Sequence, residues 1–333
     1  MTKILRKVGI GVVSTFCAAL VLGSITTFSP KALAQAYPTK PIRIVVASTP
    51  GSGPDIVARL LGGKLTEAWG QQVVVDDRAG ASGRIAAETV ARAASDGYTL
   101  LILTAQLSTV DAMYKDLKYN LVKDFSPISL IGTSTSVLVV NPSLPVTSVK
   151  ELVTLAKSRA GALRYGSSGS GTSFHLVAEL FKFMTGTDIL HVPYKGATPP
   201  LTNTMNGEVD MTFSAIAQCL PLILSGKLRA LGVSSAKRTT LASDLPSISE
   251  SVPGFDFTSW YGLIAPVKTS PAILSKLNAE VVKALNTSEV RERMTSLGIE
   301  SVGSSQKDFA LFISAQLEKL RVAVKLSGAH PED

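Results

Sequence analysis

The chain has 333 residues, of which 45% are hydrophobic, 17% charged and 6% aromatic, with a formal net charge of +8. This is the composition of a globular protein with ample apolar content for a core. The basic residues are scattered, without a basic run or interleaved aromatic residues, which argues against a nucleic-acid partner. A length near 300 residues after processing suggests two lobes of about 100–150 residues each.

The N-terminus has the pattern of an export signal. A basic start at 3–7 precedes an apolar run at 8–28, and Ala32-Leu33-Ala34 then supplies the small residues of a signal-peptidase site. Ala34-Gln35-Ala36 offers a second cleavage point. A membrane anchor is the alternative because the run is long enough to span a bilayer, but glycine, serine and threonine dilute it. We therefore predict a cleaved signal peptide at 1–34 and a protein exported to the periplasm.

Removal of this signal changes the charge and leaves one thiol. The segment carries four basic residues and no acids, so the formal charge falls from +8 to +4, which favours an anionic solute. Cys17 leaves with the signal and Cys219 remains alone, so no intramolecular disulfide is expected.

The mature chain alternates apolar β-type runs with segments of helical period. Strands are expected at 42–46, 73–75, 98–103, 137–140, 163–165, 190–192, 211–214, 229–234 and 260–265. Helices are expected from 55 through 69 and at 85–94, 149–159, 174–184, 272–285 and 306–325. Repeated alternation of strand and helix predicts an α/β fold with parallel sheets covered on both faces.

Two strand–loop–helix junctions are candidates for ligand binding. The first junction comprises Ser48, Thr49, Pro50, Gly51, Ser52 and Gly53. The second comprises Ser167, Ser168, Gly169, Gly171 and Thr172, with His175 on the first turn of the following helix. Glycine lets the backbone approach a ligand, and the free N–H groups at a helix N-terminus favour an anion. A third junction ending at Ala197 could add further amides. Glycine-rich caps are also common as purely structural features, and His175 has a structural alternative as a hydrogen-bonded histidine.

Enzyme and cofactor motifs are not recognisable. The glycine spacing before Ser167 resembles a phosphate-binding loop, but Ser167 stands where that motif needs lysine. No dinucleotide fingerprint follows a strand, and no serine-hydrolase elbow is present. His175 and His191 lack metal-ligand spacing. We predict no catalytic residue, no metal and no cofactor.

An ordered set of motifs across the mature chain resembles one family of solute-binding proteins. The motifs are Pro41-Ile42-Arg43-Ile44-Val45-Val46, Pro50-Gly51, Asp96-Gly97-Tyr98-Thr99-Leu100-Leu101, Gly169-Ser170-Gly171-Thr172, His191-Val192-Pro193-Tyr194-Lys195-Gly196, Gly207-Glu208-Val209-Asp210 and Trp260-Tyr261-Gly262-Leu263. Together they are similar to the tripartite tricarboxylate transporter receptors, or Bug-type periplasmic solute-binding proteins.

The resemblance implies a two-lobed type II periplasmic binding protein fold, with mainly parallel sheets and two interlobe crossovers. It implies a first lobe of 37–138 plus 257–333 and a second lobe of 139–256. A monomer of this kind captures a small carboxylate or related polar solute between the lobes and delivers it to a membrane permease. Ser214, where the family often has aspartate, would then lie at the cleft.

Two other functions stay open from the sequence. A ligand-sensing periplasmic protein that presents the solute to a signalling partner would need the same closing cleft. A periplasmic hydrolase using Ser168 and His175 lacks a recognisable acid partner.

Overall fold

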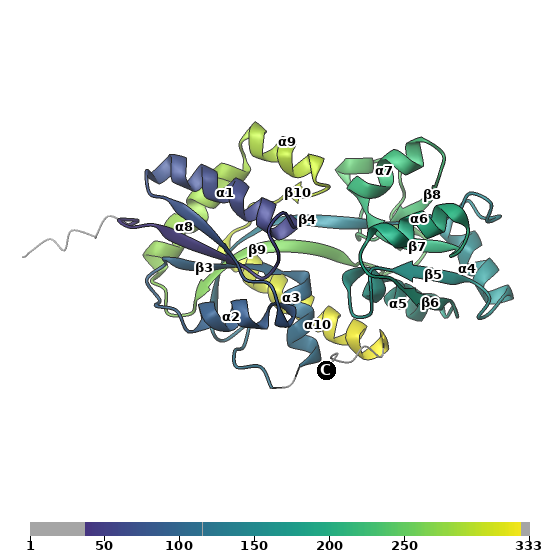
Figure 1. Ribbon diagram of the computed structural model, residues 1–333, viewed down its shortest axis with the longest axis horizontal. Coiled ribbons are helices and arrows are strands. Elements are labelled where there is room, and N and C mark those ends of the chain that lie inside the picture. The colour runs from purple at the N-terminus through teal and green to yellow at the C-terminus, as the bar shows by residue number, and fades with distance from the viewer. Residues whose placement is uncertain (1–36, 115, 328–333) are drawn as a thin grey trace, which may run out of the picture. The chain divides into compact units, whose positions relative to one another are not determined.

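The computed structural model describes residues 37–114 and 116–327. Within these ranges, the residues from Pro38 to Ser327 form one compact unit, drawn in Figure 1. The expected signal peptide at 1–34 lies outside the described residues, as do both cleavage points and Cys17. No helix in the described ranges is both long and apolar enough to cross a membrane.

Strands and helices alternate through most of the described chain. The strands are β1 (Ile42–Val46), β2 (Val73–Asp77), β3 (Thr99–Thr104), β4 (Phe125–Val140), β5 (Arg164–Ser167), β6 (Leu190–Pro193), β7 (Met211–Ala215), β8 (Arg229–Val233), β9 (Thr258–Pro266) and β10 (Glu300–Ser301). The α-helices are α1 (Gly53–Trp69), α2 (Arg84–Ala91), α3 (Ala105–Met113), α4 (Val149–Ser158), α5 (Ser173–Thr185), α6 (Thr198–Asn206), α7 (Ile216–Leu224), α8 (Pro271–Leu285), α9 (Ser288–Ser296) and α10 (Gln306–Ser327). Short 3₁₀ turns lie at Ala81–Gly83 (η1), Thr240–Ala242 (η2) and Ile248–Glu250 (η3).

The strands form two lobes that share two long strands. In the first lobe β2, β1 and β3 are parallel, and β9 and the beginning of β4 continue the sheet in antiparallel pairs. In the second lobe β6, β5 and β7 are parallel, and the end of β4 pairs antiparallel with β7 and β8. Figure 1 shows β4 and β9 running side by side between the lobes, which are the two crossovers.

The expectation of mainly parallel sheets needs correction, because the sheets are mixed. Each lobe has a parallel set of three strands, but every pairing made by β4 or β9 is antiparallel. β4 carries the chain from the first lobe to the second and β9 carries it back, so these two strands are antiparallel to each other. Each also enters its new lobe in the direction opposite to the strand that it pairs with there, β7 for β4 and β3 for β9.

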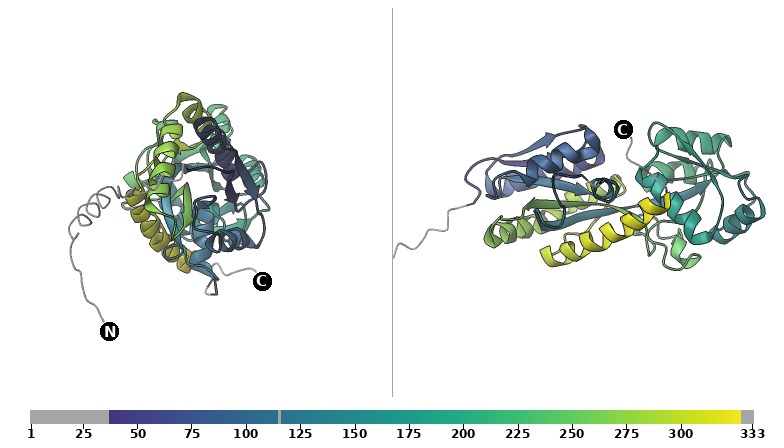
Figure 2. Two further views of the ribbon diagram at one scale, coloured as in Figure 1. Left: turned by 90° about the vertical axis from the view of Figure 1, so that its left-hand side faces the viewer. Right: turned by 90° about the horizontal axis from the view of Figure 1, so that it is seen from below.

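Each lobe buries an apolar core, and α10 contributes to both cores. In the first lobe Trp260 packs edge-to-face against Phe309 and Phe312 of α10. In the second lobe Leu320 and Val324, near the other end of α10, join the buried cluster that surrounds β5, β7 and α5. The right-hand view of Figure 2 shows this long yellow helix reaching the elements of the second lobe. The last helix therefore connects the two cores.

Candidate functional site

The first candidate loop joins β1 to α1 and is held by its own side chains. Gly51 has a φ of 78°, and its N–H donates to Oδ2 of Asp55 at 2.7 Å. Ser52 is the N-cap of α1, and its hydroxyl bonds that of Ser48 at 2.5 Å. Asp55 is 2% exposed and pairs with Nε of Arg59 at 2.6 Å. A carboxylate thus already occupies the N-terminus of α1.

The second candidate loop joins β5 to α5 and repeats this geometry. Gly171 has a φ of 73°, and its N–H donates to Nδ1 of His175 at 3.0 Å. Thr172 is the N-cap of α5, and its hydroxyl donates to the carbonyl of Gly169 at 2.7 Å. Ser168 donates to the same threonine oxygen at 2.9 Å.

The two loops differ in the charge of the side chain that accepts the glycine N–H. The caps Ser52 and Thr172 have nearly the same backbone angles, with φ of −72° and −74° and ψ of 162° in both. In each loop the acceptor lies four residues after the glycine, but it is Asp55 in one and His175 in the other. The first turn of α5 contains no acidic residue. Its partial positive charge is therefore available to an anionic ligand, whereas Asp55 offsets that of α1.

A cavity of about 140 Å³ lies between α3 of the first lobe and the second candidate loop. Its lining comprises Ser82, Gln106, Thr109, Val110, Met113, Tyr114, Ser170, Gly171 and Thr172. Gly171 and Thr172 were identified from the sequence, but the wall formed by α3 was not. Residues 48–53 are absent from this lining. Their neighbour across the fold is Tyr261 on β9, whose hydroxyl would lie 3.0 Å from a Cβ atom placed at Gly53. The structure therefore brings the second loop, but not the first, to this cavity.

Other residues identified from the sequence have internal partners. Ser167 is fully buried, with its hydroxyl 2.6 Å from Nε2 of His191. Ser214 is 1% exposed, and its hydroxyl donates to the side-chain oxygen of Gln218 at 3.1 Å. Ala197 is the N-cap residue of α6. The side chain of Ser167 thus supports the second loop, whereas that of Ser214 bonds across the start of α7, and ligand contacts at these positions stay a prediction.

Burial sets the protonation of the two histidines behind the second loop. Their rings stack with centroids 4.2 Å apart, and His191 also stacks on Tyr165 at 4.8 Å. Burial lowers the pKa of His175 below its usual value of 6.5. Burial, assisted by the neighbouring His175, lowers the pKa of His191 to about 4. Both rings are therefore neutral near pH 7.

The described residues do not support the catalytic or metal-binding alternatives. Ser168 donates its hydroxyl hydrogen to Thr172, and Nδ1 of His175 accepts from a backbone amide, so no nucleophile–base bond joins this serine and histidine. Residues 37–114 and 116–327 contain no group of three or more His, Cys, Asp or Glu arranged to hold a metal ion.

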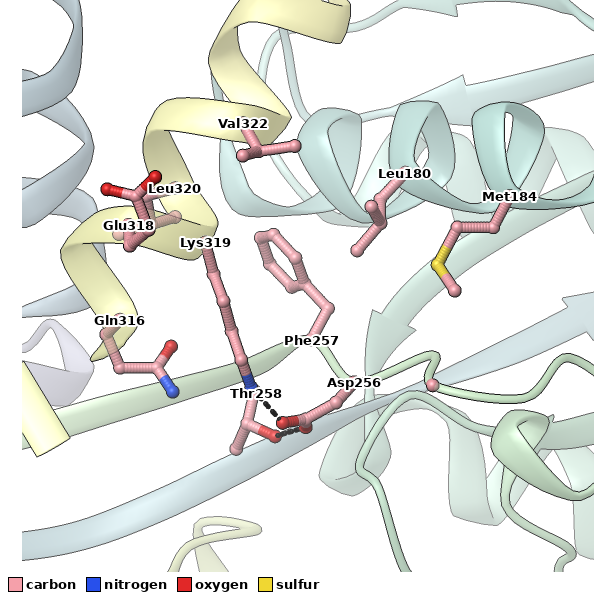
Figure 3. A pocket seen from close by; sticks show the side chains of 11 residues that line it. Leu180, Met184, Asp256, Phe257, Thr258, Gln316, Glu318, Lys319, Leu320 and Val322 are labelled. Carbon is pink, nitrogen blue, oxygen red and sulfur yellow. Dashed lines mark hydrogen bonds and ion pairs between the residues drawn. The ribbon is translucent and has the colours of Figure 1, made fainter.

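A larger cavity, of about 240 Å³, lies away from these loops where α10 meets the second crossover (Figure 3). Leu180 and Met184 of α5 face Phe257 across it, and Val322 of α10 closes one side. Lys319 of α10 forms an ion pair with Asp256, just before β9. This cavity therefore lies between α5, α10 and the segment that leads into β9, and neither glycine-rich loop lines it.

The chain is similar to a well-defined family. The family model described as tripartite tricarboxylate transporter family receptor matches residues 57–328. The protein BugT of Bordetella pertussis is 32% identical over 332 residues, covering 99% of this chain and 98% of BugT. A solved R. palustris protein with adipate is 37% identical, with a TM-score of 0.73, and covers 89% of this chain and 100% of that one. MatC from Rhodopseudomonas palustris, solved with bound malate, is 29% identical, with a TM-score of 0.70, and covers 86% of this chain and 100% of MatC.

Proposed function

The chain belongs to the family of tripartite tricarboxylate transporter receptors, which are periplasmic solute-binding proteins, and from that premise we propose that it binds a small dicarboxylate between its lobes. The observation that carries the proposal is the interlobe cavity at the N-terminus of α5. The N–H groups at the start of α5 and the absence of an acidic residue in its first turn favour an anion there.

The ligand class follows from the loops and from the relatives. Solved relatives hold adipate and malate, which are both dicarboxylates. We assign one carboxylate to Ser168–Thr172 and the amides of α5, because Asp55 would repel a second anion placed directly at α1. The first loop, Ser48–Gly53, then meets the rest of the solute with Tyr261 beside it. We also include Ser214, Ser167 and Ala197 in the proposed binding site.

The setting of this function follows the family. We propose that the mature protein is an exported monomer, cleaved after Ala34 or Ala36, that delivers its solute to a two-component membrane permease. We propose lobe boundaries at 37–138 plus 257–333 and 139–256, in keeping with β4 exchanging its β9 partner for β7 between Thr135 and Ser136. No catalytic step is part of this function.

Isothermal calorimetry with a panel of dicarboxylates, beginning with adipate and malate, tests the site. We expect Gly169→Val to abolish binding, because Gly169 has a φ of 127° and a Cβ atom there would approach the carbonyl of Tyr194 at 3.4 Å. Ser52→Trp should also abolish binding, because we propose that closure of the lobes brings the first loop against the solute and a tryptophan there would prevent it.

The matched control is Gly186→Val at the far end of α5, where φ is 60° and a Cβ atom meets nothing within 4 Å. It imposes similar backbone strain outside the site, so it should lower stability and leave affinity intact. Circular dichroism confirms folding of each variant. Wild-type affinity in both Gly169→Val and Ser52→Trp would remove the ligand from these loops.

A signalling role is the second candidate, since a sensor partner would use the same cleft. Co-purification of the liganded protein from periplasmic extract with a permease subunit, rather than with a sensor ectodomain, distinguishes the two functions.

A further inference from the structure

Both loop glycines of the β5–α5 junction are anchored to the stacked histidines. The N–H of Gly171 donates to Nδ1 of His175 at 3.0 Å. The N–H of Gly169 donates to Oγ of Ser167 at 3.2 Å, and that oxygen lies 2.6 Å from Nε2 of His191. Gly169 and Gly171 have positive φ values of 127° and 73°, so these bonds fix the part of the loop that has unusual backbone angles.

The two histidines tolerate protonation differently. A backbone N–H can only donate, so His175 must keep a lone pair on Nδ1 and carry its hydrogen on Nε2. Ser167 can reverse its role, because its hydroxyl also lies 3.3 Å from the carbonyl of Gly169 and could donate there. A proton on His191 is therefore accommodated by rotating one hydroxyl, whereas a proton on Nδ1 of His175 faces the donor of Gly171.

The surroundings offer little compensation for a charge on His175. His175 is only 5% exposed to solvent. The titratable groups around the ring pair are Tyr165, Glu179 and Lys182, together with the other histidine. The one carboxylate among them is already engaged, since Oε1 of Glu179 accepts from the Tyr165 hydroxyl at 2.6 Å and from Lys182 at 2.8 Å. Lys182 and His191 would both repel an imidazolium.

Asp55 shows what His175 supplies that another acceptor does not. In the first loop the same glycine N–H is held by a carboxylate, at the cost of a negative charge at the helix N-terminus. A neutral imidazole makes an equivalent bond and leaves the dipole of α5 available to the ligand.

We propose that His175 is a positioning residue of this site: its neutral imidazole fixes the Gly171 amide and the anion-binding loop, and protonation of His175 in acid releases both the loop and the bound carboxylate. This inference rests on the proposed function. A positively charged His175 would also attract an anion. However, the ring is buried and bonds the Gly171 amide, so its protonation would displace that amide from the loop.

The test is calorimetry with adipate on wild type, His175→Asn and His175→Leu, from about pH 7.5 to about pH 4.5. Asparagine retains an acceptor at the position of Nδ1 without titrating, and leucine removes the acceptor. At about pH 7.5 we expect His175→Leu, which has lost the acceptor, to bind about tenfold more weakly than His175→Asn, which retains one. As the pH falls toward about 4.5, wild type should lose affinity progressively relative to His175→Asn, because the histidine becomes protonated and the asparagine does not.

Adipate itself titrates in this range, so the comparison at each pH is between variants. Parallel pH profiles for wild type and His175→Asn, or a His175→Leu variant that binds like wild type, would overturn the proposal.

A ligand-free measurement separates this inference from the proposed function. In the unliganded protein labelled with ¹⁵N, the Gly171 amide resonance should shift as His175 titrates, and should not shift in His175→Asn. If no dicarboxylate of the panel binds but this shift is seen, the proposed ligand class is wrong and the role of His175 stands. Titration of His175 without any response at Gly171 overturns the role of His175 whether or not adipate binds.

Discussion

At the residue scale, the buried histidines link the stability of the folded chain to pH. Burial lowers the pKa of His191 to about 4, whereas the unfolded chain titrates near 6.5. Between these values the unfolded state binds more protons than the folded state. The contribution of His191 to the free energy of unfolding is therefore fully present above about pH 6.5 and is lost as the pH falls toward about 4. Urea unfolding at a series of pH values should show this loss.

His191→Gln is the variant that isolates the histidine. Glutamine can bond Ser167 without titrating, so its unfolding curve should lose less stability between about pH 6.5 and pH 4.5 than that of wild type. The comparison also removes the contribution of carboxyls such as Glu250, whose pKa is lowered by its bond to Arg238. Identical pH dependence in the two proteins would mean that His191 is not the titrating group.

Cys219 provides a second test at this scale. Its side chain is fully buried, and burial raises the pKa of the thiol to about 12. A thiolate is the reactive species, so the native protein should react slowly with a thiol reagent and rapidly once denatured. Stoichiometric labelling of the native protein within the same time as the denatured protein would contradict the buried position of Cys219 on α7.

At the element scale, the sequence predicts most of the strands and helices. It misses elements that lack clear boundary residues or contain a proline or glycine. Helices such as α1 and α5 have helical apolar spacing and begin after glycine and hydroxyl residues, so both were expected. The expected strand at 137–140 is only the end of β4, which begins at Phe125. Pro127 and Gly132 lie at register shifts in its first part, and such residues usually weaken a strand reading.

Four helices, α3, α6, α7 and α9, were not expected from the sequence, and the reasons differ between α3 and α7. α3 begins directly after β3, with Thr104 capping the N–H of Leu107 and no glycine or proline to mark the turn. α7 contains Pro221, which normally ends a helix. Because α3 was not expected, the predicted site was incomplete. The glycine-rich loops can be recognised in the sequence, but the cavity wall that α3 forms depends on packing between the lobes.

Gly262 on β9 is fixed by close packing against α10. A Cβ atom at this position would lie 1.9 Å from Cζ of Phe309, which belongs to the first-lobe core. We expect Gly262→Ala to destabilise the protein by about 1–3 kcal/mol or more, because the phenylalanine ring must move within a packed core.

Gly63→Ala is the matched control for Gly262→Ala. Gly63 lies inside α1, where an added Cβ meets nothing within 4 Å, and alanine should stabilise that helix by up to about 1 kcal/mol. Chemical denaturation measures both changes. A Gly262→Ala variant as stable as wild type would contradict the contact between β9 and α10.

At the scale of the whole molecule, two strands and the last helix connect the cores of the two lobes. β4 and β9 pass between the sheets side by side, and α10 adds Phe309 to the first core and Leu320 to the second. Two thin strands permit the lobes to bend relative to each other, while a helix anchored in both cores links their unfolding. We therefore expect wild type to unfold in one cooperative calorimetric transition.

Leu320→Ala tests this coupling, with Lys319→Met beside it as the control. Leu320 is 4% exposed within the second-lobe cluster, so its truncation should cost about 2–5 kcal/mol and lower the midpoint of the entire transition. Lys319 is the adjacent residue, with its side chain 49% exposed, and its ion pair with Asp256 should contribute at most about 1 kcal/mol. Because α10 also packs against Trp260, the strain of losing Leu320 should reach tryptophan fluorescence in the first lobe at the same temperature as the far-UV signal. Two separate transitions in wild type, or a Leu320→Ala variant in which only the far-UV midpoint moves, would show that the lobes unfold independently and that α10 does not couple them.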